Sequence, residues 1–212
     1  MPTFQTPAAI TAIVDVPAGY IRVIASDRTD TVVEVRPTDP HAKNDVRAAG
    51  QVQIDYTAGH LTVKMPRAWR AYAPFGGTPS IEVTVQVPAG SNLKATAALG
   101  RLLVSGPFGD CDLGVSAGDI AVEGPGGSVT AKTAKGDIRV SDAVRGDLRL
   151  ETSMGEVEVG IHPASGVQLD SSVQHGSVQN LLAPVARPDA DTVRVHVRNS
   201  YGNIVVRHSA AV

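Results

Sequence analysis

The feature that most constrains the fold of this chain is a short motif: a glycine, then a polar or tyrosyl residue, then a branched aliphatic residue. The motif occurs eight times, beginning at Gly19, Gly59, Gly100, Gly118, Gly136, Gly155, Gly176 and Gly202. Apolar residues stand two and four positions after the glycines and five and seven positions before them, and only Ser171 and Asn180 interrupt these four columns. Agreement at four flanking positions identifies a true sequence repeat.

Apolar residues alternate on both sides of each glycine, which predicts two β-strands per unit with one buried face and a turn at the glycine. From Gly100 onward the glycines are 18, 18, 19, 21 and 26 residues apart. A β-meander that curls into a sandwich could show the same alternation, but the short, nearly constant period favours stacked units that share one core. We therefore predict an all-β, β-helix-like solenoid of strand repeats of about 18–21 residues.

The first 90 residues are less regular than the rest of the chain. Their glycine motifs are 40 and 41 residues apart, and additional alternating stretches at 31–35 and 81–87 fill the gaps. Either double-length coils or a small antiparallel cap would explain this pattern, and solenoids need an atypical end that hides the core. No linker or helical periodicity is visible. We predict one domain over residues 1–212, with irregular N-terminal strands in 1–90 and regular repeats in 91–208.

Composition and motifs exclude several function classes. The net charge of −2 and the charged fraction of 19% give no basic excess for nucleic-acid binding. The single cysteine, Cys111, cannot form an internal disulfide and suits a reducing compartment. No signal peptide and no apolar run of membrane-spanning length is present, so we expect a cytoplasmic protein without a membrane span. The six histidines lack metal-ligand spacing, and no catalytic motif occurs. A protein without cofactor or enzymatic activity is favoured.

Several segments resemble actinobacterial members of the DUF4097 β-strand-repeat group, whose proteins are commonly described as adhesin-like. The segments that carry this resemblance are 14–19 (VDVPAG), 25–35 (ASDRTDTVVEV), 117–120 (AGDI) and 135–140 (KGDIRV). The resemblance extends over nearly the whole chain. It implies a β-helix-like fold and an adhesin-like role, and it supplies no catalytic residues.

Three acidic residues occupy one column, directly after the glycines of consecutive repeats: Asp119, Asp137 and Glu156. In a solenoid they would stack at about the 4.8 Å spacing of neighbouring strands. Oxygen ligands at such spacing can bind calcium. An acidic residue after glycine is also favourable turn chemistry on an exposed edge, and the same column continues with arginine, serine and asparagine. We therefore treat these residues as weak calcium candidates and expect them to be turn formers.

The segment 65–79 interrupts two clear strands and is bounded by proline and glycine. It contains three of the eight aromatic residues of the chain, including its only tryptophan. Aromatic residues and arginine dominate binding hot spots, and long irregular loops are frequently functional. The candidate binding residues are Arg67, Trp69, Arg70, Tyr72 and Phe75. The alternative is a structural lid over the irregular N-terminal core.

The sequence leaves three function classes open. The favoured class is a non-enzymatic, adhesin-like binding module that presents loops from a rigid solenoid to a protein or glycan. The second is a structural scaffold that self-assembles through open solenoid ends, where unpaired strand edges act as templates. The third is a hydrolase or lyase that acts on polysaccharide. The residues themselves do not identify a ligand or an oligomeric state.

Deletion of the candidate loop distinguishes a binding element from a lid. If the loop binds a partner, replacing residues 67–77 with a short Gly-Ser link leaves the melting temperature nearly unchanged, because the loop adds little to the core. A large drop in melting temperature would identify a lid. Trp69 fluorescence is the second measurement: red-shifted, readily quenched emission is expected from a binding element, and blue-shifted emission from a lid.

Overall fold

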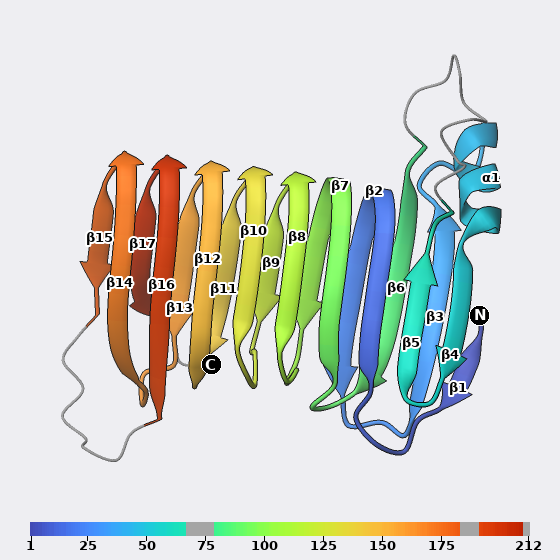
Figure 1. The fold of residues 1–212 in the computed structure, drawn as a ribbon, viewed down its shortest axis with the longest axis horizontal. Helices are drawn as coiled ribbons and strands as arrows, with labels where there is room; N and C mark the ends of the chain where they lie inside the picture. The colour runs from blue at the N-terminus through green and yellow to red at the C-terminus, as the bar shows by residue number, and fades with distance from the viewer. Residues whose placement is uncertain (67–78, 183–190, 210–212) are drawn as a thin grey trace.

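The computed structural model describes residues 1–66, 79–182 and 191–209. Within these ranges the chain forms an elongated stack of strands with a helix at one end (Figure 1). The elements are β1 (Thr3–Gln5), β2 (Thr11–Ser26), β3 (Asp30–Pro37), α1 (Lys43–Gln51), β4 (Gln53–Thr57), β5 (His60–Lys64), β6 (Ile81–Pro88), β7 (Asn92–Ser105), β8 (Cys111–Ala117), β9 (Ile120–Glu123), β10 (Val129–Lys135), β11 (Ile138–Ala143), β12 (Gly146–Met154), β13 (Val157–Ile161), β14 (Gly166–His175), β15 (Val178–Leu181), β16 (Thr192–Tyr201) and β17 (Ile204–His208).

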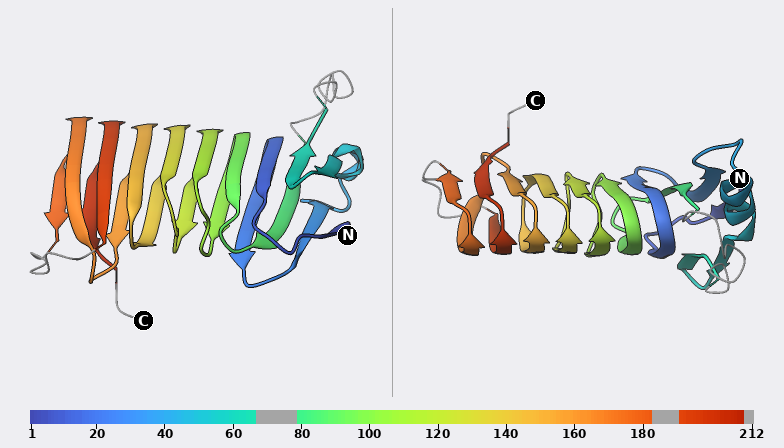
Figure 2. Two further views of the ribbon diagram at one scale, coloured as in Figure 1. Left: turned by 60° about the horizontal axis from the view of Figure 1, so that its bottom comes forward. Right: turned by 90° about the horizontal axis from the view of Figure 1, so that it is seen from above.

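The repeat units form the coils of a solenoid. The two strands of a unit meet at its glycine, and each pairs in parallel with the equivalent strand of the next unit. For example, Cys111 of β8 pairs with Val129 of β10, while Ile120 of β9 pairs with Ile138 of β11. Seen from above, the coils therefore build two facing layers of strands (Figure 2). The predicted all-β, β-helix-like solenoid is confirmed.

The four apolar columns of the sequence line the core between the two layers. In the coils that contain Gly19, Gly100, Gly118, Gly136, Gly155 and Gly202, every column residue is at most 3% exposed. Val, Ile, Leu and Ala supply nearly all of this core, together with Cys111 and the buried ring of Phe108. Burying each such aliphatic side chain stabilises the fold by about 1.5–3 kcal/mol. The four columns of stacked inward side chains, called the core ladders below, therefore account for most of the driving force of folding.

The spatial order of the coils differs from their order in the sequence. The last unit, β16–β17, lies between the β12–β13 coil and the β14–β15 coil, because β16 pairs with β12 on one side and with β14 on the other. The β14–β15 coil is thus the terminal one, although it precedes the last unit in the chain. This placement explains why only this coil carries polar residues, Ser171 and Asn180, in the core columns, where they lie at the end of the stack.

The N-terminal part is an antiparallel cap, one of the two predicted alternatives. Strand β3 pairs antiparallel with β1 on one side and with β6 on the other, and β4 pairs antiparallel with β5. The motif at Gly59 is therefore not a coil corner, as the repeat pattern predicted, but the turn of the β4–β5 hairpin. Its two leading column residues, Val52 and Ile54, are only partly buried. A hairpin turn and a coil corner share the same local chemistry, because both require a glycine with positive φ.

The helix α1 was not predicted from the sequence. It is nine residues long, and Ala48 is its only fully buried residue, so its apolar periodicity is too weak to detect. It packs beside β3 and β6 at the capped end of the stack (Figure 1). The carboxylate of Asp45 accepts hydrogen bonds from the backbone N–H of Ser80 and of Asp39, at 3.0 and 3.1 Å. None of the helices formed by the described residues is long and apolar enough to cross a bilayer.

The coil corners depend on direct contact between glycines of neighbouring coils. Gly118 and Gly136 have φ angles of +143° and +144°, which L-residues with a side chain rarely adopt. A β-carbon on Gly118 would lie 1.6 Å from the carbonyl oxygen of Gly100, and one on Gly136 would lie 2.1 Å from that of Gly118. The same contact continues through Gly155, Gly202 and Gly176. Only glycine satisfies both the backbone conformation and the close approach.

Gly136→Ala should destabilise the protein by about 3 kcal/mol or more, because the strained φ and the steric clash add together. Gly50→Ala is the matched control. Gly50 lies in α1 with open space around its α-carbon, so the same substitution there should stabilise the helix by about 0.5–1 kcal/mol. Urea denaturation of both variants measures the difference. Equal stabilities of the two variants would contradict the proposed role of the glycine contacts.

Candidate functional site

The five aromatic and arginine candidates of the sequence, Arg67, Trp69, Arg70, Tyr72 and Phe75, lie outside the described residues. The strands on either side are described. The β5 strand ends at Lys64 and β6 begins at Ile81, and both strands pair in parallel with β2. Met65 and Pro79, which flank the segment, are buried. Both ends of the candidate loop are therefore anchored in the capped part of the fold.

The acidic column runs along the corner of the solenoid, as the repeat register predicted. The Oδ1 atom of Asp119 accepts a hydrogen bond from the backbone N–H of Asp137 at 3.1 Å. In the next coil, Oδ1 of Asp137 accepts one from the backbone N–H of Glu156 at 2.9 Å. The second carboxylate oxygens form ion pairs, Asp119 with Arg101 at 3.1 Å and Asp137 with Arg139 at 3.2 Å.

These contacts give the acidic column a structural role. Each aspartate uses one oxygen to satisfy a backbone donor of the following corner, and Asn203 does the same for Ser177 at 3.1 Å. Among the described residues, no group of three or more His, Cys, Asp or Glu side chains is gathered closely enough to hold a metal ion. The arrangement is that of turn residues which link one coil to the next. Calcium binding by Asp119, Asp137 and Glu156 stays a prediction.

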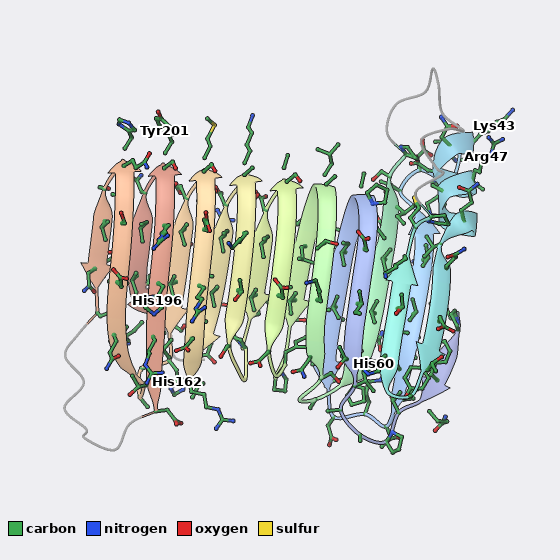
Figure 3. All side chains as sticks on the ribbon, in the orientation of Figure 1. Lys43, Arg47, His60, His162, His196 and Tyr201 are labelled. Atoms are coloured by element: carbon green, nitrogen blue, oxygen red, sulfur yellow. The ribbon has the colours of Figure 1, made fainter. Side chains whose placement is uncertain are left out.

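The outward face of the sheet β10–β12–β16–β14 carries an open groove with a volume of about 760 Å³. Its charged residues are Lys132, Arg149, Glu151, Asp170, His196 and Arg198. These residues alternate with the inward ladders along each strand, so they point away from the core. His196 lies near the middle of this face (Figure 3).

The charges in the groove are only partly paired. Lys132 Nζ lies 3.1 Å from the carboxylate of Glu151, and His196 Nδ1 lies 3.4 Å from that of Asp170. These are exposed pairs, and such pairs contribute little to stability. Lys132 neutralises the carboxylate of Glu151, whereas His196 offsets the charge of Asp170 only when its imidazole is protonated.

The side chains of Arg149 and Arg198 are exposed, and neither forms a side-chain hydrogen bond or an ion pair with the residues that the structure describes, although the register places Glu151 opposite Arg198. The register places Arg149 opposite His196, two residues before Arg198 on the neighbouring strand. Their α-carbons are thus roughly 8 Å apart, from a strand spacing of about 4.8 Å and a rise of about 6.6 Å over two residues. Two guanidinium groups are available to one anionic ligand.

A second groove, of about 800 Å³, lies on the outward face of the other layer, over β9, β11, β13 and β17. Its arginines are already paired. Glu158 forms ion pairs with both Arg139 and Arg207, the former at 3.7 Å. This groove therefore offers less free positive charge to a ligand than the first one.

Sequence reasoning missed Arg149 and Arg198. The repeat does place Arg149 in an outward column, together with His196, because both stand six residues before a repeat glycine. The charges in the outward columns vary from coil to coil, so no pattern marked the two arginines. Their proximity also depends on the insertion of β16 between β12 and β14, which the chain order does not reveal.

Cys111 is a buried thiol in a core ladder and 3% exposed. Burial, with a smaller contribution from the charge of Asp110, raises the pKa of its thiol to about 12. The thiolate is the reactive form of cysteine, so Cys111 is inert at neutral pH. It acts as a small core residue.

The backbone role of the acidic column predicts a difference between two variants of one residue. Asp137→Ala removes the acceptor of the Glu156 N–H and should cost about 1 kcal/mol, whereas Asp137→Asn keeps a side-chain oxygen and should cost less. Chemical denaturation measures both. Added calcium is expected to leave the melting temperature of the wild type unchanged. A rise with calcium that disappears in Asp137→Asn would instead support calcium binding by the column.

Comparison with known proteins places this fold in a family. A solved structure described as a "putative cell adhesion protein" from Clostridium sporogenes shares 11% identity, with a TM-score of 0.56 and coverage of 98% of both chains. A "putative adhesin" from Bacteroides fragilis shares 9% identity, with a TM-score of 0.49, over 97% of this chain and 95% of that one. At such identities the Clostridium likeness concerns the fold alone. A search of curated proteins finds no match. The profile of the Toastrack DUF4097 family matches residues 8–207, so the chain belongs to the Toastrack DUF4097 family.

Proposed function

We propose that this protein is a non-enzymatic, adhesin-like binding module, which holds a ligand on the outward face of β10–β12–β16–β14. Two facts support an adhesin-like role: the family assignment and the adhesion-related names of proteins with this fold. The observation that carries the proposal is the open groove with two unpaired arginines on a rigid sheet.

Rigidity is the property that makes this face suitable for binding. Both central strands, β12 and β16, are paired on either side, and their inward residues are locked in the core ladders. The outward residues therefore start from fixed backbone positions. A ligand that binds here loses less free energy to ordering of the protein than it would on a mobile loop.

The chemistry of the groove favours an acidic glycan. Arg149 and Arg198 match carboxylate or sulfate groups, because guanidinium forms charge-assisted, often bidentate hydrogen bonds with them. The hydroxyl groups of Thr130 and Ser172 also line the groove and can exchange hydrogen bonds with sugar hydroxyls. A linear polymer that crosses several strands would contact both arginines at once.

The candidate loop residues Arg67, Trp69, Arg70, Tyr72 and Phe75 form a second proposed contact region, for a protein or glycan partner. The loop is anchored at the capped end between β5 and β6, whereas the groove lies toward the opposite end. The two regions can therefore be tested separately, and the loop deletion described above leaves the groove unchanged.

Charge reversal tests the groove. The double variant Arg149→Glu/Arg198→Glu should bind a polyuronate or a sulfated polysaccharide at least about tenfold more weakly, because two charge-assisted contacts become repulsive. The control is Arg22→Glu/Arg47→Glu, which changes the net charge equally at exposed sites outside the groove. Titration calorimetry at two salt concentrations measures affinity, and binding to the wild type should weaken as salt rises.

Three outcomes would contradict the proposal. Equal losses in both double variants would indicate a general charge effect. Tight binding of a neutral glucan or of polyglutamate, without binding of the acidic glycans, would assign a different ligand class. Cleavage of the polysaccharide during incubation would favour a hydrolase or lyase.

A further inference from the structure

We propose that the protein forms a symmetric dimer through the end of the solenoid formed by β14 and β15, with a second copy of the chain as the partner. This inference does not rest on the proposed ligand. The surface concerned is the edge of the terminal coil, at the opposite end of the stack from α1 (Figure 1).

The edges of the terminal coil are unpaired within the part of the chain that the structure describes. Strand β14 pairs with β16, and β15 pairs with β17, and neither has a described partner on its other side. An unpaired strand edge presents a row of backbone N–H and C=O groups that can template another strand. Two such edges stand side by side here, one in each layer.

The core is also open at this end. Val178, an inward residue of β15, is 40% exposed. Val167, Leu169 and Val173, on the inward side of β14, are only partly buried. In the six inner coils the column residues are at most 3% exposed. Covering this end would extend the core ladders by one more layer and bury apolar surface that the terminal coil leaves in water.

Strand β14 lacks the devices by which proteins protect an edge. Natural edge strands are kept apart by lysine, proline, bulges or short length. The ten residues of β14 contain no lysine, arginine or proline, and their pairing with β16 shows no register shift. Asp170 and His175 are its only titratable residues. The strand is long, regular and nearly uncharged, which favours pairing with another strand.

A second copy in a closed arrangement is the occupant that fits. The other end of the stack is formed by antiparallel strands, with α1 beside β3 and β6, and its outer strands β1 and β4 are only three and five residues long. The ten-residue edge of β14 therefore meets no edge of equal length there, which disfavours head-to-tail addition of further copies. The free coil end of one copy matches only the free coil end of another. A two-fold axis normal to the sheets then pairs β14 antiparallel with its symmetry mate and places β15 beside its own mate.

The contact area fits a dimer of moderate affinity. Ten residues of β14 extend over about 33 Å and the four residues of β15 over about 13 Å, and each layer is roughly 10 Å thick. The end face is therefore on the order of 460 Å² per copy, or about 900 Å² in total, at the lower end of the range of specific interfaces.

Charge selects the register. In the dimer, the inward residues of β14 and of its symmetry mate must all face the core. This condition leaves two registers in which the two strands pair over nearly their full length. One places Asp170 opposite Asp170 of the second copy, which brings like charges together. The other places Ser171 opposite its own mate and Leu169 opposite Val173 of the second copy. We infer the second register.

Sedimentation velocity and light scattering test the dimer in the absence of any glycan. The average molecular mass should rise from that of the 22.0 kDa chain toward twice this value as the protein concentration rises from about 1 to about 100 µM. This concentration range covers dissociation constants in the micromolar range. Ser171→Glu and Ser171→Lys place like charges on the axis, so each should be monomeric. An equimolar mixture of the two should recover the dimer.

The control is Ser153→Glu, on the exposed face of β12 in the middle of the stack, which should dimerise like the wild type. Circular dichroism and melting curves check that each variant folds. Ser171→Cys supplies a second test, because it should form a disulfide-linked dimer while the buried Cys111 does not. A wild type that stays monomeric throughout, or a dimer that survives both charged variants, would overturn the proposal. Loss of glycan binding in the arginine variants would leave it unaffected.

Discussion

From Gly100 onward, each repeat glycine lies at a corner of the solenoid, so close to the carbonyl oxygen of the repeat glycine in the adjacent coil that a β-carbon would clash with it. This contact sets how closely the coils approach at the corner, and the positive φ of the glycine turns the chain from one layer into the other. The strands on both sides of the corner can then pair with their equivalents in register. The aspartates that follow the glycines satisfy the backbone N–H groups of the next corner, as Asp119 does for Asp137.

Regular stacking determines what the molecule presents to its surroundings. Because neighbouring coils pair in register over most of their length, their outward side chains form rows. The residue in each coil then decides whether the charges of a row pair with one another or remain unpaired. Arg139 and Arg207 share Glu158 on one layer, while the side chains of Arg149 and Arg198 form no ion pair with a described residue on the other. Differences in surface chemistry between the two layers thus arise on one common scaffold, and they favour an anionic ligand on one layer.

The two ends of the stack differ in how completely their core is covered. At one end, antiparallel strands and α1 cover the core, and at the other the last ladder residues remain partly exposed. The short antiparallel edges β1 and β4 do not continue the parallel pairing of the coils, which disfavours growth of a filament by coil stacking. The solenoid can close as a pair of copies, and the proposed axis would place the two arginine grooves on the same side of the dimer and so permit bivalent binding.

The repeat, the inward columns and the glycine corners could be predicted from the sequence, because alternation and glycine conformation act within a few residues of each other. The sequence did not determine that Gly59 is a hairpin turn, since a hairpin and a coil corner have the same local chemistry. Nor did it indicate α1, which buries only Ala48 completely. The tertiary structure alone decided that β16 lies between β12 and β14 and so places Arg149 near Arg198. Parallel strand pairing is non-local: any coil edge offers the same backbone donors and acceptors, so only packing of the whole chain selects which coils are neighbours.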